Sequence, residues 1–392
     1  MAKTSAPTCP TCGSDHTRIF HRVRGAPVNS CLLIGSRQEA LRFAKGNIEL
    51  AFCGECGFVF NAAFDHVASE YSQRYEETQG FSPTFQAFHE RLARRLIDKY
   101  DLRNKDVIEI GCGKGEFLNL LCRLGTNRGV GFDPGYVEER RDHGLDGQVE
   151  VIRDFYCEKY AHYQADFVCC KMTLEHIADT QSFSRAIHRL FQARPNGVVF
   201  FQVPDAARIL RQCAFEDIYY EHCSYFTAYS LRQLFEGCGF QVLDVSTEYG
   251  GQYLTIEAKP GRPLPSANDE DLARCGRYVT EFPVKWKAKQ DLWNRRFAQF
   301  RRAGRRVVLW GSGSKAVSML TSLEIRDAVE FVVDINPYRH GFFMPATGQE
   351  IVSPESLKQV LPNVVIIMNR IYRHEIEKDL RQMDLDPEVL VL

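Results

Sequence analysis

The chain has 392 residues, more than one hydrophobic core usually serves, so two or three domains are expected. Hydrophobic residues make up 44% and charged residues 25%, as in an ordinary folded protein, and the formal net charge of -1 gives no bulk electrostatic reason to bind nucleic acid or a membrane surface. The first residues, MAKTSAPTCPTCG, lack the apolar core of a signal peptide, and no later run approaches the ~18 apolar residues that span a bilayer. We therefore expect a cytoplasmic protein.

Two CxxC pairs, each followed by glycine, occur near the N-terminus: Cys9 with Cys12, and Cys53 with Cys56. Two such turns can complete a tetrahedral zinc shell of four thiolates. The alternatives are two unrelated cysteine pairs or a redox motif, but a redox motif does not need a second CxxC pair. The pattern predicts a zinc-binding module over residues 1–70, with a structural Zn2+ because no coordination position stays open.

Strand and helix patterns alternate from residue 84 to about 258. Residues 84–100 carry apolar side chains at helical spacing. Short apolar strands follow, as expected when helices cover both faces of a sheet. The predicted strands are 106–111, 128–133, 149–154, 165–171 and 197–203, with a closing hairpin at 239–248 and 253–258. This pattern predicts an α/β Rossmann-like domain over residues 71–260.

A glycine-rich turn follows the first of these strands, with Glu109, Gly111, Gly113 and Gly115 in the pattern ExGxGxG. Such glycines let the backbone approach a ligand closely. The turn lacks the third glycine of the dinucleotide fingerprint, which packs helix against strand under a pyrophosphate. The pattern therefore favours S-adenosylmethionine, a ligand without phosphate, over a nicotinamide dinucleotide or a merely tight turn.

Two further positions fit the same ligand. Asp133 follows the next strand, where a carboxylate can accept both ribose hydroxyls. Asp154 and Phe155 follow the strand after that and suit the edge and the face of an adenine.

Polar clusters follow two more strand ends, where open α/β sheets bind their ligands. Glu175 and His176 follow residues 165–171, and the run YYEHCSYF at 219–226 contains Tyr219, Glu221 and His222. A histidine can act as a general base, and a tyrosine can hold an oxyanion. The plainer alternative for the Glu175-His176 pair is a helix cap or a surface pair.

The last third of the chain repeats the α/β pattern on a smaller scale. A linker composition at 259–267 precedes one or two helices over 268–303, and strands are predicted at 305–311, 330–336 and 363–369. The turn GSGSKA with a downstream Asp334 is open to two interpretations: a dinucleotide site, or a unit that binds no cofactor and braces the substrate site. We predict a smaller C-terminal Rossmann-like domain within residues 261–392.

With these motifs identified, the chain resembles the zinc-containing sugar C-methyltransferases that act on nucleotide-linked keto-deoxysugars. Those proteins also combine a CxxC/CxxC module, a central class I methyltransferase domain and a C-terminal Rossmann-like domain. The family's Tyr-x-Glu-His run is similar to residues 219–222, its Glu-His pair to Glu175-His176, and its Gly-Gly hairpin to Gly250-Gly251.

The resemblance implies that His222 removes a proton beside a ketone, that Tyr219 and Glu221 position it, and that His176 lies near the substrate. It also implies that Tyr71 or Tyr75 faces the substrate, a nucleotide-linked keto-sugar or similar small metabolite. The chain departs from the family at residues 73–77, at 252–254 and in the C-terminal turn, all places that would touch the acceptor.

Three other functions remain open on the sequence alone. One is methylation of oxygen or nitrogen in another small metabolite with the same cofactor. Another is an NAD-dependent oxidoreductase that uses the C-terminal turn. The third is a non-catalytic binding protein.

Overall fold

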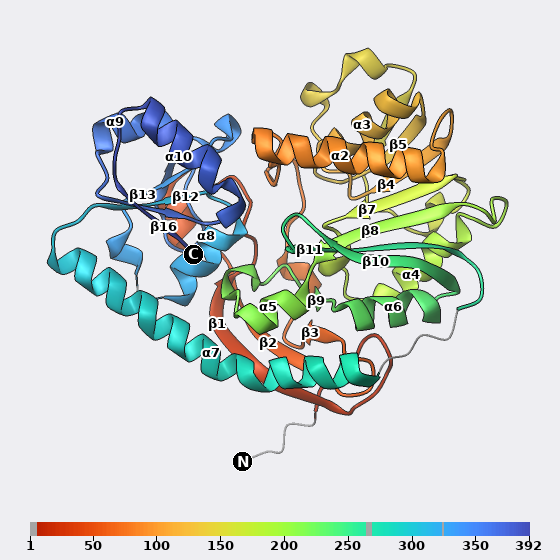
Figure 1. The fold of residues 1–392 in the computed structure, drawn as a ribbon, viewed down its shortest axis with the longest axis horizontal. Coiled ribbons are helices and arrows are strands. Elements are labelled where there is room, and N and C mark those ends of the chain that lie inside the picture. The colour runs from red at the N-terminus through yellow and green to blue at the C-terminus, as the bar shows by residue number, and fades with distance from the viewer. Residues whose placement is uncertain (1–5, 264–268, 324) are drawn as a thin grey trace.

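Three β-sheets organise the chain, which a computed structural model describes over residues 6–263, 269–323 and 325–392 (Figure 1). The first sheet is antiparallel, with the order β1-β2-β3-β9, and contains β1 (Thr17–Pro27), β2 (Lys45–Cys53), β3 (Val59–Asn61) and β9 (Ser224–Tyr225). The short helix α1 (Arg37–Leu41) lies between β1 and β2.

Strand β9 directly follows the 219–223 segment and pairs with β3. The amide of Asn61 donates to the carbonyl of Cys223 at 2.9 Å. The N-terminal sheet therefore fixes the loop that contains His222, although more than 150 residues separate the two in sequence.

The second sheet has seven strands in the order β10-β11-β8-β7-β4-β5-β6. They are β4 (Asp106–Ile110), β5 (Arg128–Phe132), β6 (Val149–Ile152), β7 (Phe167–Lys171), β8 (Val198–Pro204), β10 (Phe240–Glu248) and β11 (Tyr253–Pro260). β4 to β8 run parallel, and β11 runs antiparallel between β8 and β10. All five predicted parallel strands and the closing hairpin are present, so the α/β class is confirmed.

Helices cover both faces of this sheet, which is why its strands are continuous apolar runs. In Figure 1, α2 and α3 lie above the sheet and α4 and α6 below it. These helices are α2 (Pro83–Tyr100), α3 (Glu116–Gly125), α4 (Thr180–Arg189) and α6 (Ala228–Gly237), whereas α5 (Ala206–Gln212) packs against α7 and the N-terminal sheet. α2 begins at an N-cap, Ser82, whose side chain accepts from Phe85, and a proline follows at N1.

The third sheet is fully parallel, with the order β14-β13-β12-β15-β16. Its strands are β12 (Val307–Trp310), β13 (Phe331–Val333), β14 (Glu350–Val352), β15 (Val364–Ile367) and β16 (Glu388–Val391), and its helices are α8 (Ser314–Ser322), α9 (Leu357–Val360) and α10 (Arg373–Gln382). Two of these strands, β14 and β16, were not predicted from the sequence.

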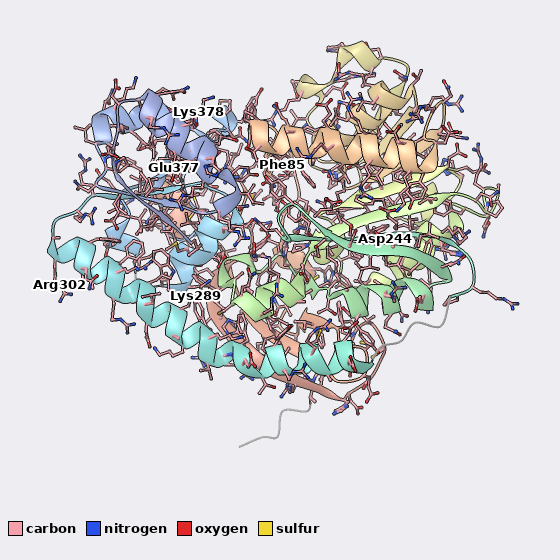
Figure 2. All side chains as sticks on the ribbon, viewed as in Figure 1. Phe85, Asp244, Lys289, Arg302, Glu377 and Lys378 are labelled. Atoms are coloured by element: carbon pink, nitrogen blue, oxygen red, sulfur yellow. The ribbon has the colours of Figure 1, made fainter. Side chains whose placement is uncertain are left out.

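One 34-residue helix, α7 (Asp269–Arg302), leads into this sheet and runs along one side of the molecule (Figure 1). Of the predicted linker, residues 259 and 260 belong to the end of β11, whereas residues 264–267 lie outside the described part of the chain. Lys289, labelled on α7 in Figure 2, donates to the carbonyl of Cys213 at 2.9 Å. α7 therefore connects the C-terminal sheet to the segment after α5.

Buried polar contacts dock the C-terminal sheet against the central one. The carboxylate of Glu76 accepts from both Nη atoms of Arg140, at 3.1 and 2.7 Å, and from Nδ2 of Asn336 at 2.8 Å. The amides of Gln252 and Asn369 donate to each other, at 2.9 and 3.1 Å. No helix of the described residues is long and apolar enough to cross a membrane.

Candidate active site

A cavity of about 370 Å3 opens between the central and the C-terminal sheets, at the carboxyl ends of their strands. Residues from the glycine-rich turn, the ends of β7 and β8, the 217–222 segment and the C-terminal turn line it. Phe85, at the N-terminal end of α2 in Figure 2, forms part of one wall. Six of the predicted catalytic and cofactor residues therefore meet in one place, whereas Gly115, Asp133 and Glu221 do not line the cavity. The six are Glu109, Gly111, Gly113, His176, Tyr219 and His222.

The three glycines of the turn have the left-handed backbone that the sequence predicted. Their φ angles are 70° at Gly111, 55° at Gly113 and 81° at Gly115. A Cβ on Gly111 would overlap the hydroxyl of Thr173, and one on Gly113 would stand 2.6 Å from Oε1 of Glu77. Only glycine fits at these two positions, and both line the cavity.

Asp133 lies behind the turn. Its carboxylate accepts from the amide of Gly113 at 2.8 Å and from that of Gly135 at 2.7 Å. Burial raises the pKa of Asp133, which these two amides partly offset. A carboxylate has about four acceptor positions, so two remain for ribose hydroxyls.

Asp154 and Phe155 do not line the cavity. Asp154 bonds the side chains of Lys159 and Tyr160, and Phe155 is 58% exposed. The ring of Phe155 nevertheless lies 6.3 Å from that of Tyr71, centroid to centroid, at the rim of the site. Their contact with an adenine stays a prediction.

Glu109 lines the cavity from the end of β4 and is almost fully buried. Oε1 lies 3.6 Å from Sγ of Cys169, and Oε2 has no hydrogen-bond partner. Burial raises the pKa of Glu109 to about 7. A donor brought by a ligand would satisfy this oxygen.

His222 is buried at the centre of the cavity wall, with its ring 4.0 Å from that of Tyr219, centroid to centroid. Nδ1 has no partner, and Nε2 lies 3.9 Å from Oε1 of Glu175. Burial, followed by the charges of His176 and Lys315, lowers the pKa of His222 well below its usual value. The neutral ring can accept a proton, and the neighbouring carboxyl can stabilise the resulting imidazolium.

Glu175 is the residue whose role sequence reasoning missed. Neither of its oxygens has a hydrogen-bond partner, and burial raises its pKa to about 8. Glu175 lies beside His222 because two segments 47 positions apart come into contact. Neither the Glu175-His176 pair nor the 219–226 run predicts this contact by itself.

Glu221, expected to position His222, faces elsewhere. Its carboxylate accepts from the hydroxyl and the amide of Ser30 and from Asn29. Its carbonyl oxygen lies 3.1 Å from Nδ1 of His176, which in turn lies 2.8 Å from the hydroxyl of Tyr71. Burial lowers the pKa of His176 to about 4. Glu221 thus anchors the loop and, through its backbone, orients His176.

The C-terminal turn forms the opposite wall. Ser314 lies 2.7 Å from Ser30, hydroxyl to hydroxyl, and Lys315 forms an ion pair with Asp217, which also pairs with Arg208. Asp334, the carboxylate expected at a dinucleotide ribose, accepts from the amide and the hydroxyl of Ser312 at 2.8 and 2.5 Å. The turn lines the cavity, and both interpretations of it, a dinucleotide site and a brace for the substrate site, stay predictions.

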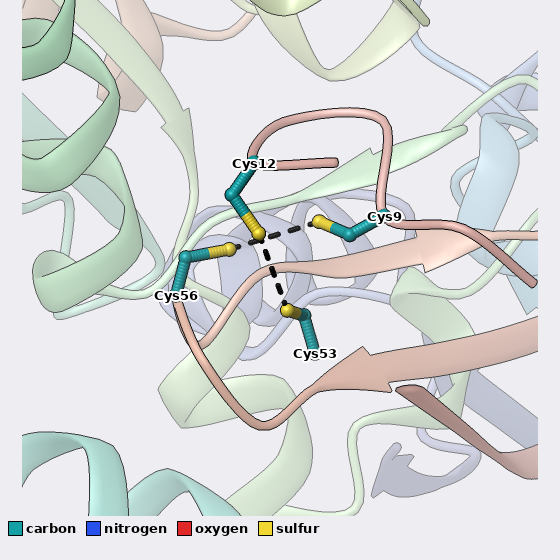
Figure 3. A group of neighbouring side chains, drawn as sticks. All are labelled: Cys9, Cys12, Cys53 and Cys56. Carbon is teal, nitrogen blue, oxygen red and sulfur yellow. Dashed lines mark hydrogen bonds between the residues drawn. The ribbon is translucent and has the colours of Figure 1, made fainter. Parts of the chain in front are cut away.

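Figure 3 shows the four N-terminal cysteines converging from two loops. Their sulfurs lie within 4.8 Å of one another, with Cys9 and Cys56 at 3.7 Å and Cys12 and Cys53 at 3.6 Å. A tetrahedral zinc with Zn–S bonds of about 2.3 Å separates its sulfurs by about 3.8 Å. The donor set and its spacing fit zinc.

A second group of potential metal ligands lies in the cavity. One ligand atom each of Glu175, His176 and His222 falls within the same 4.8 Å limit. These are also the groups best placed for proton transfer, so metal analysis can separate the two roles.

Comparison with known proteins gives two family matches. A methyltransferase domain model matches residues 84–245, and a C-methyltransferase C-terminal domain model matches residues 268–386. The C-methyltransferase NovU of Streptomyces niveus is 26% identical over 303 residues, which cover 73% of this chain and 71% of that protein.

Other similarities cover smaller shares of this chain. A ubiquinone biosynthesis O-methyltransferase of Citrobacter koseri is 33% identical over 149 residues, 36% of this chain and 58% of that protein. A solved structure, the 1,6-didemethyltoxoflavin-N1-methyltransferase of Burkholderia thailandensis, has 16% identity and a TM-score of 0.36, and the match covers 46% of this chain and 81% of that one.

The two domain models and the NovU similarity agree with the α/β fold and with the glycine-rich turn at the mouth of the cavity. Together they identify the chain as an S-adenosylmethionine-dependent methyltransferase.

Proposed function

We propose that the enzyme methylates a carbon next to a ketone in a small molecule. The observation that carries this proposal is the neutral, buried His222, which faces the same cavity as the cofactor turn and has an unsatisfied ring nitrogen. Carbon acids beside a carbonyl are weak, so their methylation needs a base and a donor for the oxygen, whereas the sulfonium is a good leaving group on its own.

The roles of the side chains follow from their positions. A free ring nitrogen of His222 takes the proton from the carbon, and the electron pair of the C–H bond becomes the enolate. Burial raises the pKa of Tyr219 well above its usual value, so its hydroxyl keeps its proton and can donate to the enolate oxygen. His176, held by the carbonyl of Glu221, is the second donor candidate.

The cofactor supplies an activated methyl group, which the enolate carbon receives as the bond between methyl and sulfur breaks. Glu109 and the backbone of Gly111 and Gly113 would hold its amino-acid portion, and Asp133 its ribose. The residues fit such a ligand because Glu109 has an unpartnered buried oxygen and a Cβ would fill the space over Gly113. The enzyme then contributes orientation and the base.

A nucleotide-linked keto-sugar is the acceptor we propose first. Two cations of the cavity lining, Arg208 and Lys315, share the single carboxylate of Asp217. An anionic group of the acceptor would be attracted there. The similarity to NovU, itself named a C-methyltransferase, supports carbon as the methylated atom.

We further propose that Cys9, Cys12, Cys53 and Cys56 bind a structural Zn2+ and that the chain divides into segments 1–70, 71–260 and 261–392. A cytoplasmic location belongs to the same proposal, supported by the ten other cysteines, none of which forms a disulfide.

Methylation of oxygen or nitrogen is the second candidate, favoured by the 33% identity that 149 residues share with a ubiquinone biosynthesis O-methyltransferase. It needs His222 only as a base for a hydroxyl or an ammonium.

The test supplies methyl-labelled S-adenosylmethionine with nucleotide-linked keto-sugars and locates the label in the product by NMR. We expect a new methyl group on carbon. A label on oxygen or nitrogen would overturn carbon methylation and leave the cofactor assignment unchanged.

A further inference from the structure

A half-buried lysine lies near the glycine-rich turn without an ion-pair partner. Lys171 ends β7, and its ammonium nitrogen lies 3.0 Å from Nε2 of His89 and 3.8 Å from the centre of the Phe117 ring. Among the described residues, no carboxylate oxygen lies within 4.0 Å of it. Burial lowers the pKa of Lys171 and the charge of Glu109 raises it, so an anionic ligand at this position would stabilise the ammonium form.

His89 prepares Lys171 for such a ligand. Burial, followed by the charge of Lys171, lowers the pKa of His89 to about 2, so the ring is neutral and Nε2 accepts one N–H of the lysine. An ammonium has three N–H groups, so two remain. These two can meet the oxygens of a carboxylate that enters the cavity, which Lys171 and His89 both line.

The Glu77 carboxyl lies at the same turn, and burial raises its pKa to about 7, so a cationic group of a ligand would favour its ionised form. Oε2 of Glu77 has no hydrogen-bond partner and lies 3.6 Å from the ammonium of Lys114. The ammonium of Lys114 also donates to the carbonyls of Tyr75 and Gly135, both at 2.8 Å. Its positive charge therefore only partly compensates the Glu77 carboxylate. The exposed third of the Glu77 side chain borders the cavity above Gly113.

This end of the cavity therefore offers an unpaired cation and an incompletely paired anion to one ligand, and an amino acid in its zwitterionic form matches both. We propose that Lys171 binds the carboxylate and Glu77 the ammonium of the amino-acid portion of S-adenosylmethionine, with His89 as the positioning residue of Lys171. The proposal rests on the cofactor assignment made above and adds two binding residues to it.

The test is calorimetric titration of the full chain with S-adenosylhomocysteine, with its decarboxylated analogue and with its deaminated analogue. Because a charge-assisted contact is lost in each case, we expect the wild-type protein to bind either analogue about tenfold or more weakly than S-adenosylhomocysteine. Equal affinity for S-adenosylhomocysteine and the decarboxylated analogue would overturn the role of Lys171 without any variant.

Variants connect each charge to its residue. Lys171→Met should bind S-adenosylhomocysteine about tenfold or more weakly than wild type does, yet its affinity for the decarboxylated analogue should stay within about twofold of wild type. Glu77→Gln should show the same pattern with the deaminated analogue. Lys287→Met, at an exposed position on α7, is the matched control and should bind all three ligands as wild type does.

The outcomes are distinct. If Lys171→Met lowers the affinity for S-adenosylhomocysteine and for the decarboxylated analogue equally, the lysine does not contact the carboxylate and the proposal fails. Absence of any binding of S-adenosylhomocysteine to the wild-type protein would instead refute the cofactor assignment on which the proposal rests.

Discussion

Replacing Glu175 by glutamine should stabilise the folded chain at neutral and alkaline pH. Glu175 is 1% exposed, neither of its oxygens has a hydrogen-bond partner, and burial raises its pKa from 4.5 to about 8. His222, 3.9 Å away, is neutral and gives the carboxylate little compensation. Glutamine preserves the shape of the side chain and removes the ionisation.

The sign follows from linkage between proton binding and folding. Below pH 4.5 the carboxyl is protonated in both states, so Glu175 adds no pH-dependent term. Between pH 4.5 and about 8, the Glu175 carboxyl loses its proton in the unfolded chain but keeps it in the folded chain. The free energy of unfolding therefore falls as pH rises. At about 1.4 kcal/mol per pKa unit, the loss reaches about 5 kcal/mol at pH 8 and stays below about 1 kcal/mol at pH 5.

Urea unfolding of wild type and Glu175→Gln at pH 5 and pH 8 measures this difference. We expect nearly equal stability at pH 5 and a higher midpoint for the variant at pH 8. Glu90→Gln, at an exposed position on α2, is the control and should show no gain. A Glu175→Gln variant that is no more stable than wild type at pH 8 would refute the view that this carboxyl is buried without compensation.

Three further predictions concern the two ligand sites. Asp133→Asn should weaken S-adenosylmethionine by about tenfold or more in calorimetry, because a charge-assisted contact with the ribose is lost, whereas Asp98→Asn on the exposed face of α2 should not. Gly113→Val should also abolish cofactor binding, since its side chain would meet Glu77, and retained affinity would remove the turn from the site. Metal analysis should find about one zinc per chain, and Cys53→Ser should lower both zinc content and thermal stability. A second equivalent of metal, retained by Cys53→Ser, would place a metal at the cavity histidines instead.

Much of the fold was predictable from the sequence because buried parallel strands are short apolar runs that end in glycine or polar residues. The strands of the central sheet and the turn after β4 follow this pattern. The convergence of four cysteine sulfurs was predictable too, since paired CxxC turns have few other uses. Strands β14 and β16 were missed because they form the two edges of the third sheet and are less buried, so they lack the continuous apolar run of the inner strands.

The details of the site were less predictable because they depend on contacts distant in sequence. The Glu221 carboxylate turns toward Ser30, 191 positions earlier, rather than toward His222. Lys171 was visible only as the last residue of an apolar strand, and its partner His89 lies on α2, 82 positions before it. Sequence motifs indicate which segments form the site, whereas tertiary packing determines which of their side chains are in contact.

The measurement that tests the account most directly is exchange of substrate protons with deuterated water in the presence of S-adenosylhomocysteine. If His222 forms an enolate before methyl transfer, wild-type enzyme should place deuterium on the carbon beside the ketone of a nucleotide-linked keto-sugar without any turnover. His222→Ala should lose exchange and methylation together, by about 10²–10⁴ in rate, and keep its affinity for S-adenosylhomocysteine. Methylation by wild type with no deuterium on carbon, or full activity of His222→Ala, would contradict the account.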